Sequence, residues 1–266
     1  KVAGVMLGGV QLLPTAESLG HSVRRSVDAA FLNAGSMHPL NLVQLVAPYL
    51  FTNRVTGQNT HEMGAYLGAV PLMLLVWLVI RRRELGHRRR LVACVAGFGL
   101  LVLLLALGKY GPVYRLQHFL PLVGSFRCPC RYLVLVSLCV AVLSAVAVAT
   151  LARGQESGEK ISRPRARLLW AVVAASALAA TVGLAMRGHS HIAATPAVLS
   201  GPLLIGSAAA LLVFAARGAR WALIGLVLFA AADLGYYGMS YAVFPHVEPL
   251  DAYLAHARTP QAGCDG

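Results

Sequence analysis

The chain has 266 residues, of which 58% are hydrophobic and 12% charged, and its mean hydropathy is +0.67. A soluble domain of this length could not bury so much apolar surface, so the composition favours a membrane protein. The formal net charge of +13 would suggest nucleic-acid binding in a soluble protein. Here the basic residues form short clusters between long apolar runs, which indicates lipid headgroups and topology signals, and nucleic acid is not an expected partner.

Apolar segments long enough to cross a bilayer dominate the chain. A helix needs about 20 apolar residues to cross the hydrocarbon core. Six segments meet this requirement, at about 64–80, 91–107, 132–151, 168–186, 198–216 and 221–239. A shorter apolar stretch, "VAGVMLGGVQLL", resembles the end of a helix. We therefore expect an all-α polytopic membrane protein: one transmembrane domain over 1–266, a fragment of a larger protein, with six spans and a truncated N-terminal helix.

The segments that connect the spans differ in length and in basic residues. Short basic loops at 81–90, 153–167 and 217–220 alternate with longer, less basic segments at 14–63, 108–131, 187–197 and 240–266. The positive-inside rule places the short basic loops in the cytoplasm and the longer segments outside. For the arginine clusters themselves, topology and contacts with anionic membrane lipids are the expected roles.

The external segment 14–63 is the most informative connection. Fifty residues are many for a structureless loop, and long loops often carry function. In "MHPLNLVQLVAPYLF" the apolar residues follow helical spacing, which predicts an amphipathic helix in the membrane interface that Pro48 bends or ends. Another short helix is expected to begin near Thr15.

An ordered set of stretches carries a family resemblance across nearly the whole chain. The stretches are "QLLPTAESLGHSVR", "HPLNLVQLVAPYLF", "HEMGAYLGAVPLMLL", "LLALGKYGPVYRLQHFLPLVGSFRCPCRYL" and "AADLGYYG". In these the chain resembles the YfhO-type bacterial integral membrane proteins, which are placed among the GT-C-type glycosyltransferases. The resemblance implies a bacterial cytoplasmic-membrane enzyme that transfers sugar from a polyprenyl-phosphate donor to a cell-surface glycopolymer or lipid. It also implies that the catalytic acidic residue lies upstream of Lys1.

Basic residues of the external segments are the candidates for binding the donor phosphate. The planar fork of arginine suits phosphate because it gives bidentate hydrogen bonds. The candidate lipid-phosphate ligands are Arg24, Arg25, Lys109, Arg127 and Arg131. In "SFRCPCRYL" we expect Pro129 to fix an extended turn that directs Arg127 and Arg131 at the headgroup layer. The alternative for these two arginines is anchoring of the span that follows.

Carboxylates are scarce in the external segments, and inverting sugar transfer needs one as a base for the acceptor hydroxyl. Glu17 and Glu62 are therefore candidate catalytic residues. A surface ion pair is the alternative for Glu17, and a helix cap or a metal ligand for Glu62. Asp233 lies within the last predicted span, where a carboxylate should face the interior and have a partner, in a functional or a structural role. Its neighbours Tyr236 and Tyr237 are typical of an interfacial aromatic belt.

The sequence gives no support for a metal or a cofactor. The histidines lack metal-ligand spacing. Cys128 and Cys130 have no second ligand pair, and a disulfide between them would close a strained ring. The remaining alternative to an enzyme is a non-enzymatic polytopic protein, such as a transporter or an accessory to a lipid-glycan flippase. Transporters usually have broken helices at the membrane midplane and several intramembrane charges.

Overall fold

Helices form all the regular elements in the described part of the chain. The structure is a computed structural model that describes residues 14, 17–18, 33–52, 55, 62–117, 128–156, 163–189 and 191–242. In chain order the elements are η2 (Pro39–Leu45), α3 (Ala69–Ile80), α4 (Arg88–Ala106), η3 (Gly108–Tyr110), α5 (Tyr114–Gln117), η5 (Pro129–Tyr132), α6 (Leu133–Glu156), α7 (Arg163–Ala185), α8 (Thr195–Ala216) and α9 (Arg220–Ala242), where η marks a 3-10 helix. The predicted all-helical fold class is confirmed.

Five helices among the described residues are long and apolar enough to cross a membrane. They cover Arg88–Ala106, Pro129–Gln155, Arg167–Ala185, Thr195–Ala216 and Arg220–Met239. Their outward faces carry large apolar side chains, such as Val134 (72% exposed) and Leu203 (69% exposed). Apolar surface on this scale is compatible with a lipid environment. These helices correspond to five of the six predicted spans, as expected for a multi-pass membrane protein.

The first predicted span, 64–80, is helical only from Ala69, and the prediction of a continuous helix was wrong there. Residues 64–68 are irregular, and Gly68 has a φ of 94°, outside the helical region. Pro71 follows in the first turn of α3, where a missing N–H group costs little. The 12 residues of α3 rise about 18 Å. This is well short of the roughly 30 Å hydrocarbon core.

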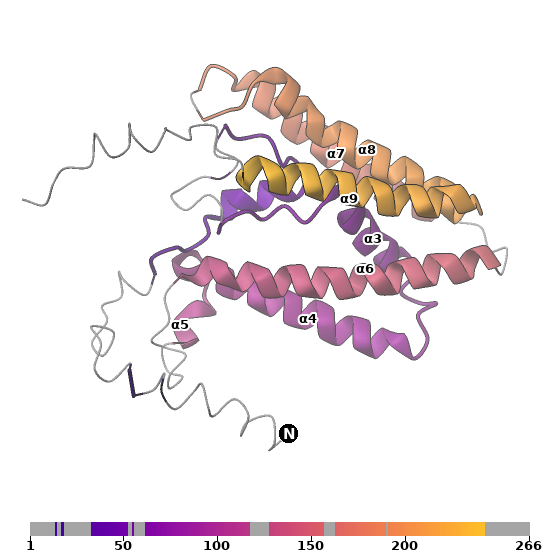
Figure 1. The fold of residues 1–266 in the computed structure, drawn as a ribbon, viewed down its shortest axis with the longest axis horizontal. Coiled ribbons are helices and arrows are strands. Elements are labelled where there is room, and N and C mark those ends of the chain that lie inside the picture. The colour runs from indigo at the N-terminus through magenta and orange to yellow at the C-terminus, as the bar shows by residue number, and fades with distance from the viewer. Residues whose placement is uncertain are drawn as a thin grey trace, which may run out of the picture.

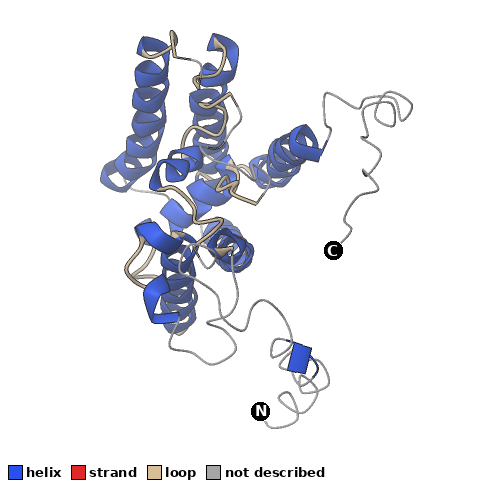
Figure 2. Cartoon of the chain, turned by 90° about the vertical axis from the view of Figure 1, so that its left-hand side faces the viewer, coloured by secondary structure: helices blue, strands red, loops and turns tan. Residues whose placement is uncertain are grey.

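The short helix α3 lies at the centre of the bundle. It packs against α6 on one side and against α7, α8 and α9 on the other, while α4 packs on α6 (Figure 1). Met73 and Trp77 of α3 are almost completely buried in the main core cluster. Facing positions of α8 carry fully buried Ala208 and Ala209, whose small side chains allow close helix approach. Figure 2 shows the helices in the perpendicular view.

Segments that the sequence places on one side of the membrane are found at one end of the bundle. Two backbone hydrogen bonds join them, from Cys128 N–H to the Ala34 carbonyl (3.1 Å) and from Thr52 N–H to the His191 carbonyl (3.0 Å), and Met37 N–H donates to the carbonyl of Ala106 (3.1 Å) at the end of α4. The predicted segments 14–63, 108–131 and 187–197 therefore meet in space. The Arg-rich turn between α3 and α4 lies at the opposite end of the bundle from these segments (Figure 1).

The predicted interfacial helix is instead the 3-10 helix η2, and it is inserted among the long helices. Its polar residues Asn41 and Gln44 are fully buried. Ser176 Oγ of α7 donates a 2.5 Å hydrogen bond to the Val46 carbonyl just after η2. At Gly201 of α8 an added Cβ would lie 3.3 Å from the Val46 carbonyl oxygen. Small residues on α7 and α8 thus admit a segment that amphipathicity alone would place on the surface. The truncated N-terminal helix, and most of the helix expected near residue 15, lie outside the described residues.

Candidate functional site

Three backbone segments are locked together where α6 begins. Cys130 N–H donates to the Gly35 carbonyl (3.1 Å), and Lys109 N–H donates to Ser36 Oγ (3.0 Å). Gly108 has a φ of 54°, and an added Cβ there would lie 2.8 Å from Pro129 Cγ. Only glycine combines this backbone conformation with so close an approach. We call this meeting point of residues 33–38, 106–110 and 128–131, together with Glu62, the outer cluster.

Pro129 begins the 3-10 helix η5, so the predicted extended turn was wrong. Cys128 precedes it with a φ of 67°, a left-handed conformation that is unfavourable for a side-chain-bearing residue. The hydrogen bonds of Cys128 and Cys130 to residues 34 and 35 hold this backbone in place. Both thiols are free and buried in an apolar cluster with residues such as Met37 and Val102. The two cysteines therefore contribute to packing at this point.

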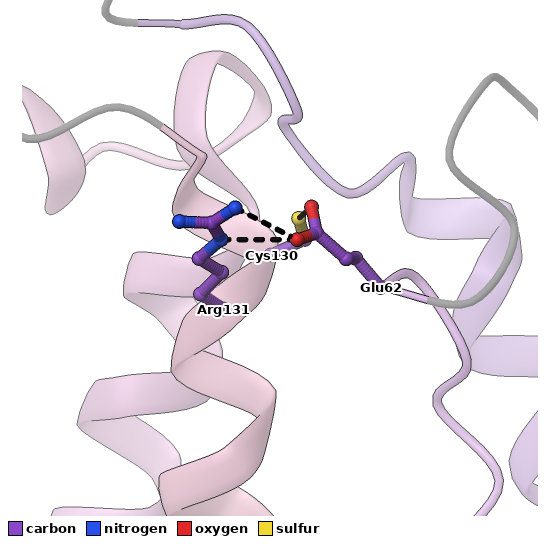
Figure 3. A network of polar contacts seen from close by, with 3 residues as sticks. All are labelled: Glu62, Cys130 and Arg131. Carbon is purple, nitrogen blue, oxygen red and sulfur yellow. Dashed lines mark hydrogen bonds and ion pairs between the residues drawn. The ribbon is translucent and has the colours of Figure 1, made fainter.

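Glu62 and Arg131, a candidate base and a candidate phosphate ligand, bind each other (Figure 3). Arg131 Nε and Nη2 donate to the same carboxylate oxygen, Glu62 Oε1, at 3.0 and 2.9 Å. The other oxygen, Oε2, lies 3.9 Å from Cys130 Sγ. The Arg131 side chain is 65% exposed and that of Glu62 22%. Such a pair is screened by solvent and contributes little to stability, so an anion arriving from solution can compete for the guanidinium.

Lys109 adds a second cation to the outer cluster. Its Nζ lies 5.1 Å from the centroid of the Tyr110 ring, and the His38 ring packs edge-on against Tyr110 at 4.9 Å. Tyr114, the first residue of α5, is almost fully buried. Burial, with smaller contributions from Tyr132, Cys128 and Cys130, raises the pKa of the Tyr114 phenol to about 12, so it stays protonated at neutral pH. The outer cluster therefore offers two cations, one carboxylate and aromatic rings on an accessible surface.

Asp233 lies in a second, buried cluster and has the interior partners that the sequence predicts. Tyr66 Oη donates to both carboxylate oxygens (2.9 and 2.7 Å), and Ala69 N–H donates to Oδ2 (2.9 Å). Ala69 is the first residue of α3, and Gly68 before it offers no side-chain cap. A carboxylate from α9 thus caps α3 across the bundle, at the positive end of its dipole. We call Asp233, Tyr66, Gln44, Tyr49 and Tyr237 the inner cluster.

Gln44 connects three parts of the inner cluster. Its Oε1 accepts hydrogen bonds from Ala65 N–H and from Tyr237 Oη, each 3.2 Å long. The rings of Tyr66 and Tyr237 pack with centroids 4.8 Å apart. Tyr237 is 7% exposed, so its assignment to an interfacial aromatic belt was wrong: its hydroxyl group has a buried amide to bind. Tyr236 is 64% exposed.

Among the predicted site residues, the structure pairs Glu62 with Arg131 and places the backbone of Lys109 in the same outer cluster, whereas Asp233 lies in the inner one. Glu17 is exposed and joins neither cluster. Arg24, Arg25 and Arg127 lie outside the described residues. Within the described ranges, no group of three or more His, Cys, Asp or Glu side chains could hold a metal ion.

Sequence reasoning missed Gln44, Tyr66 and Ser36. A signal existed for the first two, since Asn41 and Gln44 are amides spaced for one helix face within an apolar run, and Tyr66 lies between the glycines of "GAYLG". Glycines in an apolar run often mark close backbone approach. Ser36 carries no such signal, because its partner at residue 109 is distant in the chain.

Comparison with known proteins gives no family assignment. No protein-family model matches the chain, and no curated protein or solved structure matches it. Function is therefore inferred from the residues themselves and from their geometry.

Proposed function

We propose that the chain is a membrane glycosyltransferase-like protein that uses a polyprenyl-phosphate-linked sugar as donor. The observation that carries this proposal is the outer cluster, in which the Glu62–Arg131 ion pair and the backbone segment of Lys109 lie where apolar helices end. A lipid-phosphate donor has matching chemistry, because its phosphate lies at the interface while its chain stays in the bilayer. The resemblance to YfhO-type proteins points to the same class of donor.

The proposed membrane is the bacterial cytoplasmic membrane, with the outer cluster on the external face. The distribution of Arg and Lys supports this orientation, since the basic turns lie at the opposite end of the bundle. The proposed acceptor is a cell-surface glycopolymer or lipid. The proposal requires neither a metal nor another cofactor.

The outer cluster supports an exchange mechanism for this reaction. The donor phosphate displaces Glu62 from Arg131 and takes charge-assisted hydrogen bonds from Arg131 and Lys109. The freed Glu62 carboxylate accepts the proton of the acceptor hydroxyl while that oxygen bonds to the anomeric carbon. The bond from this carbon to the phosphate oxygen breaks, and the polyprenyl phosphate leaves with its charge stabilised by the two cations.

The test is glycan decoration of the bacterial surface by single variants of the full-length protein. We expect Arg131→Gln to lower decoration at least tenfold, because the leaving phosphate loses its bidentate partner. Glu62→Gln should lower it by a similar factor, through loss of the base. Arg217→Gln, which removes a charge at the other end of the bundle, is the matched control.

Protein amounts in the membrane must be equal across these variants, as measured by immunoblot. Normal decoration in both Arg131→Gln and Glu62→Gln would contradict the proposed site. Arg131→Lys keeps the positive charge but loses the planar group that donates two hydrogen bonds. Glycan decoration in this variant should therefore lie between that of the unmodified protein and that of Arg131→Gln.

A specific observation favours a second candidate, a non-enzymatic transporter or lipid-glycan flippase accessory. The half-length helix α3 begins inside the bundle, and its N-terminus is capped by Asp233. Discontinuous helices of this kind are common at transporter binding sites. In reconstituted vesicles, movement of a labelled lipid-linked sugar that Asp233→Asn abolishes and Glu62→Gln leaves intact would favour this second function.

A further inference from the structure

An apolar groove runs along the outside of the bundle between α3 and α4, with α6 as its floor. Its volume is about 510 Å³, within the range of about 300–1,000 Å³ typical of small-molecule sites. Its walls include Leu72 and Val79 of α3, Ala96 and Leu103 of α4, and Val140 and Leu143 of α6. Its only charged lining residues in the described structure, Arg82 and Arg89, lie together at the end with the Arg-rich turn.

A second, smaller pocket adjoins that end of the groove. It has a volume of about 160 Å³ and is lined by three arginines, Arg81, Arg88 and Arg153, with Glu84 as its one carboxylate. Leu85 lines both the groove and this arginine pocket. On α6, Val140 and Leu143 line the groove and Thr150 and Gly154 the pocket, with spacings that place all four on one helix face. The two cavities therefore follow each other along α6.

The arginine pocket has an excess of positive charge that is partly held away from water. Arg81 is 5% exposed, forms an ion pair with Glu84 and lies over the Trp77 ring at 5.4 Å. Three guanidinium groups and one carboxylate line the pocket, so its lining carries a formal excess of positive charge. Arginine near the membrane surface attracts anionic lipid headgroups. This pocket is suited to a phosphate group.

We propose that an anionic phospholipid binds across these two cavities, with its phosphate in the arginine pocket and one acyl chain in the groove. From Arg89 to Leu103 the α4 wall of the groove rises about 21 Å. One leaflet of the hydrocarbon core is about 15 Å thick, so the groove holds a full acyl chain. The charge at one end and the apolar wall beyond it match a phospholipid better than a neutral lipid. The site lies at the opposite end of α6 from Arg131 and does not depend on the proposed donor site.

The test compares phosphatidylglycerol with phosphatidylcholine as probes. The full-length protein in neutral detergent is titrated with each lipid, and bound lipid is counted by native mass spectrometry. We expect phosphatidylglycerol to bind at least tenfold more tightly. Arg88→Gln with Arg153→Gln should remove this preference, and Ala96→Phe, which fills the groove, should weaken binding of both lipids.

Matched controls separate these effects from general damage. Arg217→Gln with Arg220→Gln removes two exposed charges from the turn between α8 and α9, and Ala175→Phe enlarges an exposed side chain on α7. Both should bind like the unmodified protein. Arg88→Lys with Arg153→Lys keeps both positive charges and should keep the preference for phosphatidylglycerol. This result would show that the glutamine variant loses the preference because it loses the charges and not because substitution at these positions unfolds the protein.

Three results would overturn the proposal. Equal phosphatidylglycerol binding in the two double glutamine variants would place the headgroup elsewhere. Equal lipid binding by Ala96→Phe and Ala175→Phe would show that the acyl chain does not lie in the groove. Full competition by millimolar inorganic phosphate, with no effect of Ala96→Phe, would show a free-phosphate site instead of a lipid site.

Discussion

The outer and inner clusters each pair a carboxylate with donors far away in the sequence, and they differ in their access to solvent. Arg131 is largely exposed beside Glu62, whereas Asp233 and its partner Tyr66 are both buried. Solvent weakens an exposed ion pair, and interior burial makes an unmet hydrogen bond costly. The carboxylate in the outer cluster can therefore exchange its partner, whereas the carboxylate in the inner cluster stabilises the fold.

Each cluster also depends on a glycine in the left-handed region. Gly108 lets Ser36 and Pro129 approach in the outer cluster, and Gly68 ends the irregular segment before α3 in the inner one. Stability measurements on matched variants test this difference between the two clusters.

The largest expected effect is that of Asp233→Ala. It leaves the Tyr66 hydroxyl and the Ala69 N–H group buried without an acceptor, so the free energy of unfolding should fall by about 2–4 kcal/mol. Asp233→Asn keeps one acceptor oxygen and should lose about half as much. The measurement is unfolding in detergent followed by circular dichroism. An Asp233→Ala protein as stable as the native one would show that the cap contributes nothing.

A smaller effect is expected for Gly68→Ala. The backbone there has a φ of 94°, and the new Cβ would lie 3.0 Å from Pro71 Cδ and 3.1 Å from Leu234 Cδ2. Strain and crowding together should cost about 1–3 kcal/mol. Gly218→Ala is the control for strain alone, because its φ is 99° and an added Cβ meets no atom within 4 Å. Equal losses in both variants would mean that close packing at Gly68 is unimportant.

The outer-cluster glycine gives a direct counterpart. In Gly108→Ala the new Cβ would approach Pro129 Cγ to 2.8 Å and Ser36 Cβ to 2.7 Å, so we expect a loss of about 1–3 kcal/mol. The change should also lower glycan decoration, since it displaces the backbone that carries Lys109. Gly97→Ala, at an open position of α4, should leave decoration unchanged.

The smallest stability effect is expected for Glu62→Gln. Solvent screens this exposed ion pair, so the free energy of unfolding should change far less than in Asp233→Ala. A loss as large as that of Asp233→Ala would mean that the two clusters do not differ in the way proposed. Unfolding of both variants in the same detergent makes the comparison direct.

The long helices were predictable because apolar length and basic loops are local properties. Five predicted spans agree with helices of the structure to within a few residues at most of their ends. The inward position of Asp233 was also predictable, since a carboxylate in an apolar helix has few other stable places. The break before Ala69 was not predicted, because residues 64–68 are apolar and two of their hydrogen bonds, from Ala65 N–H to Gln44 and from the Tyr66 hydroxyl to Asp233, go to residues distant in the chain.

The all-helical class, the lengths of the apolar helices and the scarcity of carboxylates follow directly from the amino-acid sequence. The pairing of Glu62 with Arg131, the contact of Gln44 with Tyr237 and the start of α3 at Ala69 depend on how the helices pack. The physical reason is the need to satisfy every buried polar group where water is excluded. An irregular segment can lie inside the bundle because a distant amide and a distant carboxylate accept the Ala65 and Ala69 N–H groups, and those partners are fixed only when the helices pack.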